Sequence, residues 1–323
     1  MGIRYLNRFL KDNAASSIKL CGLSELSGKK IAVDISIYMY RFASDEVLIE
    51  NMYLMLSVFR YYNIIPIFIF DGKPPPEKYE LLQKRKENKK DAESEYNKLK
   101  EMLELNKNMD EADRQEIIYN MDMLKKKFVS ISKNDVETVK NLIRYYGATY
   151  YDSPGEADEL CSALTMKEKV WACLSEDMDM FVYGCPRVIR YLSLLNHTAV
   201  VYDLKDILCN LGINQKQLRE ICILSGSDYN LGIDNANSLN DVLKLFRKYY
   251  KSNKNMDFYD WLNEFRPGFI KDHELLCKIY TMFDLNANQF IGNTFDKIKI
   301  KNGPILKDEI KQILKKDGFL FPI

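Results

Sequence analysis

Short apolar runs that each end at a carboxylate constrain the fold of this chain more than any other feature. The runs are rich in Ile, Val and Phe; one ends at Asp34 and another at Asp71. Runs of roughly four to eight such residues are typical of buried strands in a sheet that helices cover on both faces. In such sheets the functional crevice lies outside the carboxyl ends of the strands. We therefore predict an α/β fold with a mostly parallel central sheet flanked by helices.

Seven acids occupy positions of this kind, and they come from well-separated segments. If they converge, their charge repels itself unless hard divalent cations neutralise it. Two Mg²⁺ ions about 3.5–4 Å apart are the usual arrangement for phosphodiester cleavage, and Mn²⁺ is a possible substitute. The sequence therefore predicts a metal-dependent nuclease. The expected ligands are Asp34, Asp71, Glu156, Asp158, Asp177, Asp179 and Asp228.

Each acid also has a purely structural interpretation. Asp34 could cap the helix that follows it, and Asp71 with Gly72 could form a strand-terminating turn. Ser153 and Glu156 have the spacing of a capping box. The remaining acids could be solvated residues of loops or helix ends. We prefer the metal-site hypothesis because all seven acids are expected either at the ends of strands or in segments that border the same crevice.

The composition narrows the class of protein. With 323 residues and 46% hydrophobic content, the chain can bury a sizeable core. Basic and acidic residues number 47 and 46, so nucleic-acid binding has to come from local basic patches. Seven scattered cysteines and two histidines argue against a zinc site and fit a reducing compartment. We expect a soluble intracellular protein without membrane contact, because no apolar stretch or secretory signal suggests otherwise.

Residues 1–76 read as a βαβ unit, with strands at Ile31–Val33 and Ile64–Phe70 and a helical stretch from about Ser36 to Tyr62. Residues 77–130 contain no Pro or Gly and are dominated by helix formers, so they predict a helical insertion.

The α/β pattern then resumes and gives way to helices. The expected elements are a helix at 135–146, a helix from 156, strands at 147–151, 170–174, 188–192 and 199–202, mostly helix from 203 to 265, and a break at 266–268. The last two strands are expected to form a hairpin through Asn196.

Six sequence blocks point to a known family. In chain order they are MGI, VDISIYMYRF, FIFDGKPP, GEADELCSAL, LSEDMDMFVYG and ILSGSDY. They resemble the flap endonuclease family of structure-specific 5′ nucleases, and look most like the divergent version that poxviruses carry. The resemblance covers roughly residues 1–230, and the insertion at 77–130 falls where the family has its helical arch.

The resemblance implies a PIN-like 5′ nuclease core with a helical arch and a helical DNA-binding region. The implied regions are the N-terminal part of the core at 1–76, the arch at 77–130, the internal part of the core at 131–230, a divergent helix-hairpin region at 231–265 and a C-terminal region at 266–323. All seven acids match the family's metal ligands, with Asp158 in place of the usual Glu.

The resemblance also assigns roles outside the acids. Lys78 and Arg85 match a catalytic basic pair that reaches the scissile phosphate, and Tyr40 matches an aromatic that stacks on the neighbouring nucleotide. Gly2 matches a residue that lets the N terminus pack near the active site and its DNA. Basic residues of the arch are expected to track single-stranded DNA: Lys84, Lys86, Lys89 and Lys90. The alternatives are a merely solvated charged helix for the arch and an ordinary core aromatic for Tyr40.

Two departures from the family pattern stand out. After Asp228 the duplex-binding loop keeps Gly232 and Ile233 but has Asp234 in place of the second glycine. An aspartate there would repel a phosphate and lacks the backbone freedom of glycine. The C-terminal residues also lack the motif by which many relatives bind the sliding clamp, so no protein partner is predicted.

The implied function is a Mg²⁺-dependent endonuclease that cleaves 5′ flaps or branched DNA in replication, recombination and double-strand-break repair. Its partner is DNA with a single-strand/double-strand junction. A poxviral protein would work in the host cytoplasm, and any other in the nucleus. The alternatives are a Holliday-junction resolvase or 5′–3′ exonuclease, a catalytically weak DNA-binding scaffold, and a ribonuclease on the same core.

Overall fold

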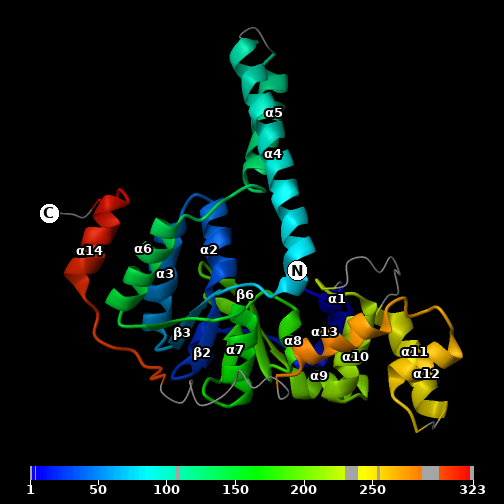
Figure 1. The fold of residues 1–323 in the computed structure, drawn as a ribbon. Helices are drawn as coiled ribbons and strands as arrows, with labels where there is room; N and C mark the ends of the chain where they lie inside the picture. Colours follow the sequence, from blue (N-terminus) through cyan, green and yellow to red (C-terminus); the bar gives the residue numbers. More distant parts are fainter. Residues whose placement is uncertain are drawn as a thin grey trace.

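A seven-stranded sheet separates two layers of helices (Figure 1). The computed structural model describes residues 2–3, 5–106, 110–229, 239–252, 255–285 and 298–320, without the side chains of 111–113. The strands are β1 (Ile18–Gly22), β2 (Lys30–Asp34), β3 (Ile65–Phe70), β4 (Thr149–Asp152), β5 (Ala172–Leu174), β6 (Arg187–Ser193) and β7 (Thr198–Asp203). Their order is β1-β7-β6-β5-β2-β3-β4.

The five strands from β6 to β4 are mutually parallel, and β7 runs antiparallel to both of its neighbours. The prediction of a mostly parallel sheet flanked by helices is therefore confirmed. β6 and β7 form the expected hairpin. The sequence did not predict β1, because this edge strand exposes Lys19 and Leu20 and so lacks the apolar pattern of a central strand.

Most of the α-helices follow the sequence pattern, but the helices at Leu6–Asn13 and Asp179–Tyr183 were not predicted. The α-helices are α1 (Leu6–Asn13), α2 (Ile35–Ser44), α3 (Leu48–Tyr61), α4 (Tyr79–Leu105), α5 (Glu111–Lys125), α6 (Lys133–Tyr145), α7 (Ala157–Met166), α8 (Asp179–Tyr183), α9 (Leu204–Leu211), α10 (Gln215–Ser225), α11 (Leu239–Ser252), α12 (Phe258–Phe265), α13 (His273–Phe283) and α14 (Lys307–Lys316). The helical stretch predicted from Ser36 to Tyr62 is two helices, because Glu46 between them takes a left-handed φ of 61°. Within the described residues, no helix combines the length and apolarity needed to cross a membrane.

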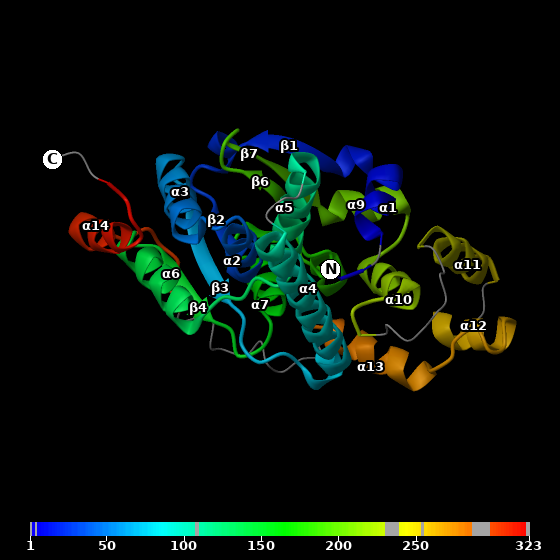
Figure 2. The same cartoon turned by 90° about the horizontal axis from the view of Figure 1, so that it is seen from above.

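Alternate residues of the central strands enter two different cores. In β2, Ile31 and Val33 belong to one core, and Ala32 belongs to the other. In β3, Phe68 belongs to the same core as Ile31 and Val33, and Ile67 belongs to the core that contains Ala32. The period of two that a strand imposes explains this division. Helices α2, α3, α6 and α14 cover one face, and α7 lies on the other with α1, α9 and α10 (Figures 1 and 2).

Helices α4 and α5 stand away from the body as an antiparallel pair, which we call the arch (Figure 1). Among the 27 residues of α4, only Leu81 and Ala92 are buried. The arch is nevertheless held at its base. Nζ of Lys126, at the end of α5, lies 3.7 Å from Oδ1 of Asp45 in the turn between α2 and α3. Lys125 forms an ion pair with Glu46 in the same turn.

The C-terminal segment crosses the β4 edge of the sheet and returns to the core. Gly303 donates a backbone hydrogen bond to Gly147 O at 2.7 Å, and Leu306 donates one to Tyr145 O at 2.7 Å. A side chain at Gly147 would meet the Gly303 backbone at 2.6 Å, and its φ of +70° also favours glycine. Helix α14 then packs on α6 and contributes Leu314 to the core.

Removing the apolar anchor of α14 should destabilise the nuclease core itself. Leu314 is 1% exposed, so Leu314→Ala should lower the free energy of unfolding by about 2–5 kcal/mol through lost burial and a cavity. Urea unfolding of the full chain measures this change. Lys311→Ala, an exposed position on the same helix, is the control and should change it by less than about 0.5 kcal/mol. Equal effects of the two substitutions would contradict the role of α14 as a core helix.

Candidate active site

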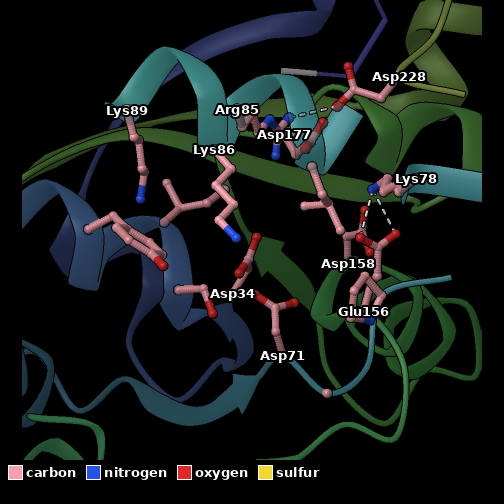
Figure 3. Close-up of a pocket in the computed structure, with 16 residues that line it drawn as sticks. Asp34, Asp71, Lys78, Arg85, Lys86, Lys89, Glu156, Asp158, Asp177 and Asp228 are labelled. Carbon is pink, nitrogen blue, oxygen red and sulfur yellow. Dashed lines mark hydrogen bonds and ion pairs between the residues drawn. The ribbon is translucent and has the colours of Figure 1, made fainter. Parts of the chain in front are cut away.

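The seven predicted acids meet at the carboxyl edge of the sheet, and Figure 3 shows six of them. Asp34 is the last residue of β2, Asp71 follows β3, and Asp177 follows β5. These strands are parallel neighbours, so their ends share one edge. Six of the acids line a cavity of about 780 Å³: Asp34, Asp71, Glu156, Asp158, Asp177 and Asp228. The seventh, Asp179, is fully buried and is not part of the cavity wall.

Asp158, Asp177 and Asp179 form the densest part of the cluster. Each offers a carboxylate oxygen within 4.8 Å of the others. Both oxygens of Asp179 are buried and have no hydrogen-bond partner among the described residues. Burial, and then the charge of Asp177, raise the pKa of Asp179 well above its usual range. An unpaired buried carboxylate is costly, and a hard cation with oxygen ligands would compensate for it. The alternative that Asp179 is a solvated loop acid is wrong.

Asp34 is buried beside Ser175, whose hydroxyl donates to Asp34 Oδ2 at 2.9 Å. Burial, together with the charge of Asp71, raises the pKa of Asp34 to about 8. Asp71 itself accepts a hydrogen bond from Ala157 N at 2.8 Å. This contact ties the end of β3 to the start of α7, the helix that carries Asp158.

Gly72 allows that connection because it lies against the loop before α7. Its N–H donates to Gly155 O at 2.8 Å. A Cβ on Gly72 would lie 2.0 Å from Ser153 O, and backbone cannot move away as a flexible side chain can. The alternative that Asp71 and Gly72 merely form a strand-terminating turn is therefore incomplete, because it does not include the contact with the loop before α7 that positions Asp71.

Glu156 is held by two side chains from distant segments. Lys78 Nζ donates to both carboxylate oxygens at 2.7 Å (Figure 3), and Tyr229 Oη donates to Oε2 at 2.9 Å. The capping-box alternative is wrong, because Glu156 itself occupies the N-cap position and Ser153 Oγ donates to the Glu156 carbonyl. Burial would lower the pKa of Lys78, but the carboxylates of Asp158 and Glu156 outweigh it and raise the pKa.

Sequence reasoning missed Tyr229 and Ser175. Their signal in the sequence was weak but present, because Tyr229 directly follows Asp228 and Ser175 lies shortly before Asp177. Neither side chain belongs to an acidic or basic pattern, and hydrogen bonding to a carboxylate across the fold is visible only in three dimensions.

The arch brings further cations to the cavity. Arg85 Nη2 lies 3.1 Å from Asp228 Oδ2, and Lys86 and Lys89 also line the cavity (Figure 3). Lys84 and Lys90 are exposed on α4 and do not contribute to the cavity wall. The structure thus brings four of the six predicted basic side chains to the acids, including Lys78.

Tyr40 lies on the wall of the same cavity with 48% of its surface exposed. The ammonium of Lys89 lies 5.1 Å from the centre of its ring. The alternative of an ordinary core aromatic is therefore wrong, and the ring is accessible from the cavity.

Gly2 lies against the acids. A Cβ at this position would be 2.3 Å from Asp177 Oδ1 and 2.5 Å from Asp179 Oδ1, and its φ is +77°. Only a residue without a side chain fits here. The altered loop that contains Gly232, Ile233 and Asp234 lies outside the described residues.

Known protein families match the two segments of the chain that carry the acids. The XPG N-terminal domain matches residues 1–92 and the XPG I-region matches residues 147–228, together more than half of the chain. The chain belongs to the XPG family. It is 31% identical over 247 residues to flap endonuclease 1-B of Xenopus laevis, and 30% identical over 247 residues to flap endonuclease 1 of Homo sapiens. Each alignment covers 71% of this chain, which spans 61% and 62% of the respective relatives.

Solved structures show the same fold. The catalytic core of Rad2 in complex with DNA substrate matches with a TM-score of 0.66 at 21% identity, covering 98% of this chain and 94% of that one. Flap endonuclease-1 from Methanococcus jannaschii matches with a TM-score of 0.57 at 22% identity, covering 93% and 97%. Human GEN1 in complex with Holliday junction DNA matches with a TM-score of 0.63 at 18% identity, covering 98% and 74%.

The raised pKa values predict that cation binding depends on pH. Protons and Mg²⁺ compete for the carboxylates of Asp34, Asp158 and Asp179, so affinity should rise and proton release should fall as pH increases from about 6 to about 9. Without divalent cations, the free energy of unfolding should fall as pH rises from about 4 to about 8, because folding raises the pKa of Asp34 from 3.8 to about 8 and also raises the pKa of Asp158 and Asp179. Calorimetry in buffers of different ionisation enthalpy measures the protons released. Cation affinity independent of pH would contradict this expectation.

Proposed function

We propose that this chain is a divalent-cation-dependent endonuclease that cleaves DNA at 5′ flaps or related branched structures. The observation that carries the proposal is one cavity at the base of the arch. Six of the acids line it together with Lys78 and Arg85, and the seventh, Asp179, is buried beside Asp158 and Asp177. Membership of the XPG family and the likeness to flap endonuclease 1 support this function. The structural neighbours include complexes with DNA, which supports a DNA substrate.

The seven acids are the ligands that we propose for two Mg²⁺ ions. The donor set fits, because it consists of carboxylates and includes the oxygens of Asp179, which no described residue hydrogen-bonds. Bound there, the cations supply Lewis-acid activation of water and charge neutralisation at the phosphodiester. The chain itself holds the acids in place through Ser175 on Asp34, Ala157 N on Asp71 and Tyr229 on Glu156.

The arch side chains provide fixed positive charge beside the acids. Lys78 and Arg85 are paired with Glu156 and Asp228, and in the proposed reaction they turn to the scissile phosphate and stabilise the charge that develops on it. Tyr40 offers an exposed ring for a base, where stacking contributes about 1–3 kcal/mol. Lys86 and Lys89 at the cavity, with Lys84 and Lys90 further along α4, would attract the strand backbone, and Gly2 would keep the N terminus close to the acids and the bound strand.

The biological setting follows from the sequence resemblance. We propose roles in DNA replication, recombination and double-strand-break repair. The closer likeness to the poxviral version, with action in the host cytoplasm rather than the nucleus, remains a prediction from the sequence blocks. Resolution of Holliday junctions and 5′–3′ exonuclease activity use the same acids, so substrate preference has to be measured.

Cleavage of a defined substrate set tests the proposal. With Mg²⁺, the chain should incise an end-labelled 5′ flap at its junction faster than a 3′ flap, a four-way junction or single-stranded RNA. Asp179→Ala should abolish cleavage, because it removes a ligand from the centre of the cluster.

The stability of Asp179→Ala shows whether a loss of cleavage comes from unfolding. Removal of a buried, unpaired carboxylate should leave the free energy of unfolding equal or higher in EDTA. Metal-dependent cleavage of none of these substrates, with DNA binding intact, would contradict the nuclease function and favour the scaffold.

Removal of either arch cation should slow the chemical step. Lys78→Ala and Arg85→Ala should each lower kcat by about 10²–10³, the scale for loss of one preorganised electrostatic donor. Single-turnover cleavage of the preferred substrate measures this effect. Lys100→Ala is the control for Arg85→Ala, because it removes an exposed cation of the same helix, α4, beyond the cavity. Near wild-type rates for Lys78→Ala and Arg85→Ala would overturn the assignment.

A further inference from the structure

Tyr229 touches two members of the site at once. Its hydroxyl donates to Glu156 Oε2 at 2.9 Å, and Lys78 Nζ lies 4.9 Å from the centre of its ring. The side chain is buried, with 8% exposed. Lys78 also donates to both oxygens of Glu156. The three side chains therefore form a closed triangle in which Tyr229 is the member without a net charge.

The triangle joins three segments that are distant in the chain. Lys78 lies at the root of the arch, Glu156 lies at the start of α7, and Tyr229 lies beyond the end of α10. The ion pair between Lys78 Nζ and Glu156 Oε2, at 2.7 Å, fixes the distance between the two charged groups, but it does not fix their orientation relative to the cavity. The hydrogen bond from the Tyr229 hydroxyl to Glu156 Oε2 and the contact of the Tyr229 ring with the Lys78 ammonium fix that orientation.

Helix α13 holds the ring of Tyr229 from behind. The ring of Phe283, fully buried at the end of α13, lies edge-on to Tyr229 with centroids 5.5 Å apart. The same helix reaches the root of the arch, because Lys278 Nζ lies 3.0 Å from Glu77 Oε1, next to Lys78. Tyr229 is thus supported by a helix that also contacts the segment carrying Lys78.

We propose that Tyr229 is a positioning residue of the nuclease reaction, which orients the carboxylate of Glu156 through its hydroxyl and the ammonium of Lys78 through its ring. The inference rests on the proposed function for its consequence in turnover. Its consequence for cation binding does not depend on cleavage. Hydrogen bonds to ligating carboxylates typically matter tenfold to a hundredfold for cation affinity or activity.

Substitutions at Tyr229 separate the two contacts. Tyr229→Phe keeps the ring and removes the hydroxyl, whereas Tyr229→Leu removes both. Tyr259→Phe is the matched control, because Tyr259 is a buried tyrosine of α12 whose hydroxyl donates to Glu220 O at 2.9 Å outside the cavity. Both Phe variants lose one buried hydrogen bond, so a purely structural role predicts the same result for each.

The expected result is a specific effect on kcat and on cation affinity. Tyr229→Phe should lower kcat about tenfold and raise the half-saturating Mg²⁺ concentration about tenfold, with an unchanged KM for DNA. Tyr229→Leu should lower kcat further, because Lys78 also loses its ring. Calorimetric Ca²⁺ binding should weaken in Tyr229→Phe and stay at the wild-type value in Tyr259→Phe.

The outcomes distinguish this inference from the proposed function. If Tyr229→Phe matches Tyr259→Phe in kcat, Mg²⁺ dependence and Ca²⁺ affinity, the positioning role is wrong while the nuclease function stands. If the wild-type chain cleaves no DNA, the proposed function fails, and Ca²⁺ affinity alone decides whether Tyr229 orients Glu156.

Discussion

The gathering of negative charge at the carboxyl edge of the sheet is the constraint on which the rest of the structure depends. Burial raises the pKa of Asp34 to about 8 and raises the pKa of Asp158 and Asp179 as well, so these acids resist ionisation. The fold offsets part of the charge with Lys78 on Glu156 and Arg85 on Asp228. Arg85 comes from the arch, and Lys78 immediately precedes its first helix, so both ion pairs connect the start of the arch to the acids.

Close backbone packing is the second requirement of this arrangement. Gly72 lies against the backbone of Ser153, and Gly2 lies against the carboxylates of Asp177 and Asp179. A side chain at either position would push apart the segments that carry the acids. The acids can therefore meet only because the residues beside them have no side chains, a condition that the charge pattern by itself does not reveal.

The sequence predicted that the acids come together, but it did not predict which side chains contact them. Asp34, Asp71 and Asp177 follow apolar runs, and the ends of neighbouring parallel strands share an edge, so the convergence of these three acids follows from pattern and topology. The capping-box alternative at Ser153 is wrong, because the side chain of Glu156 binds Lys78 while Ser153 Oγ donates to the carbonyl of Glu156. The edge strand β1 escaped prediction because its outward residues are exposed.

By itself, the sequence determined the mostly parallel α/β sheet, the helical insertion and the positions of the acids, because strand periodicity, helix-forming composition and carboxylates after apolar runs are local properties. Tertiary structure alone decided which partner each acid has. Tyr229 and Ser175 reach Glu156 and Asp34 across 73 and 141 residues of chain. It also decided that Asp179 is buried without a hydrogen-bond partner among the residues that the structure describes. Those outcomes depend on how distant segments pack, and no local pattern encodes that packing.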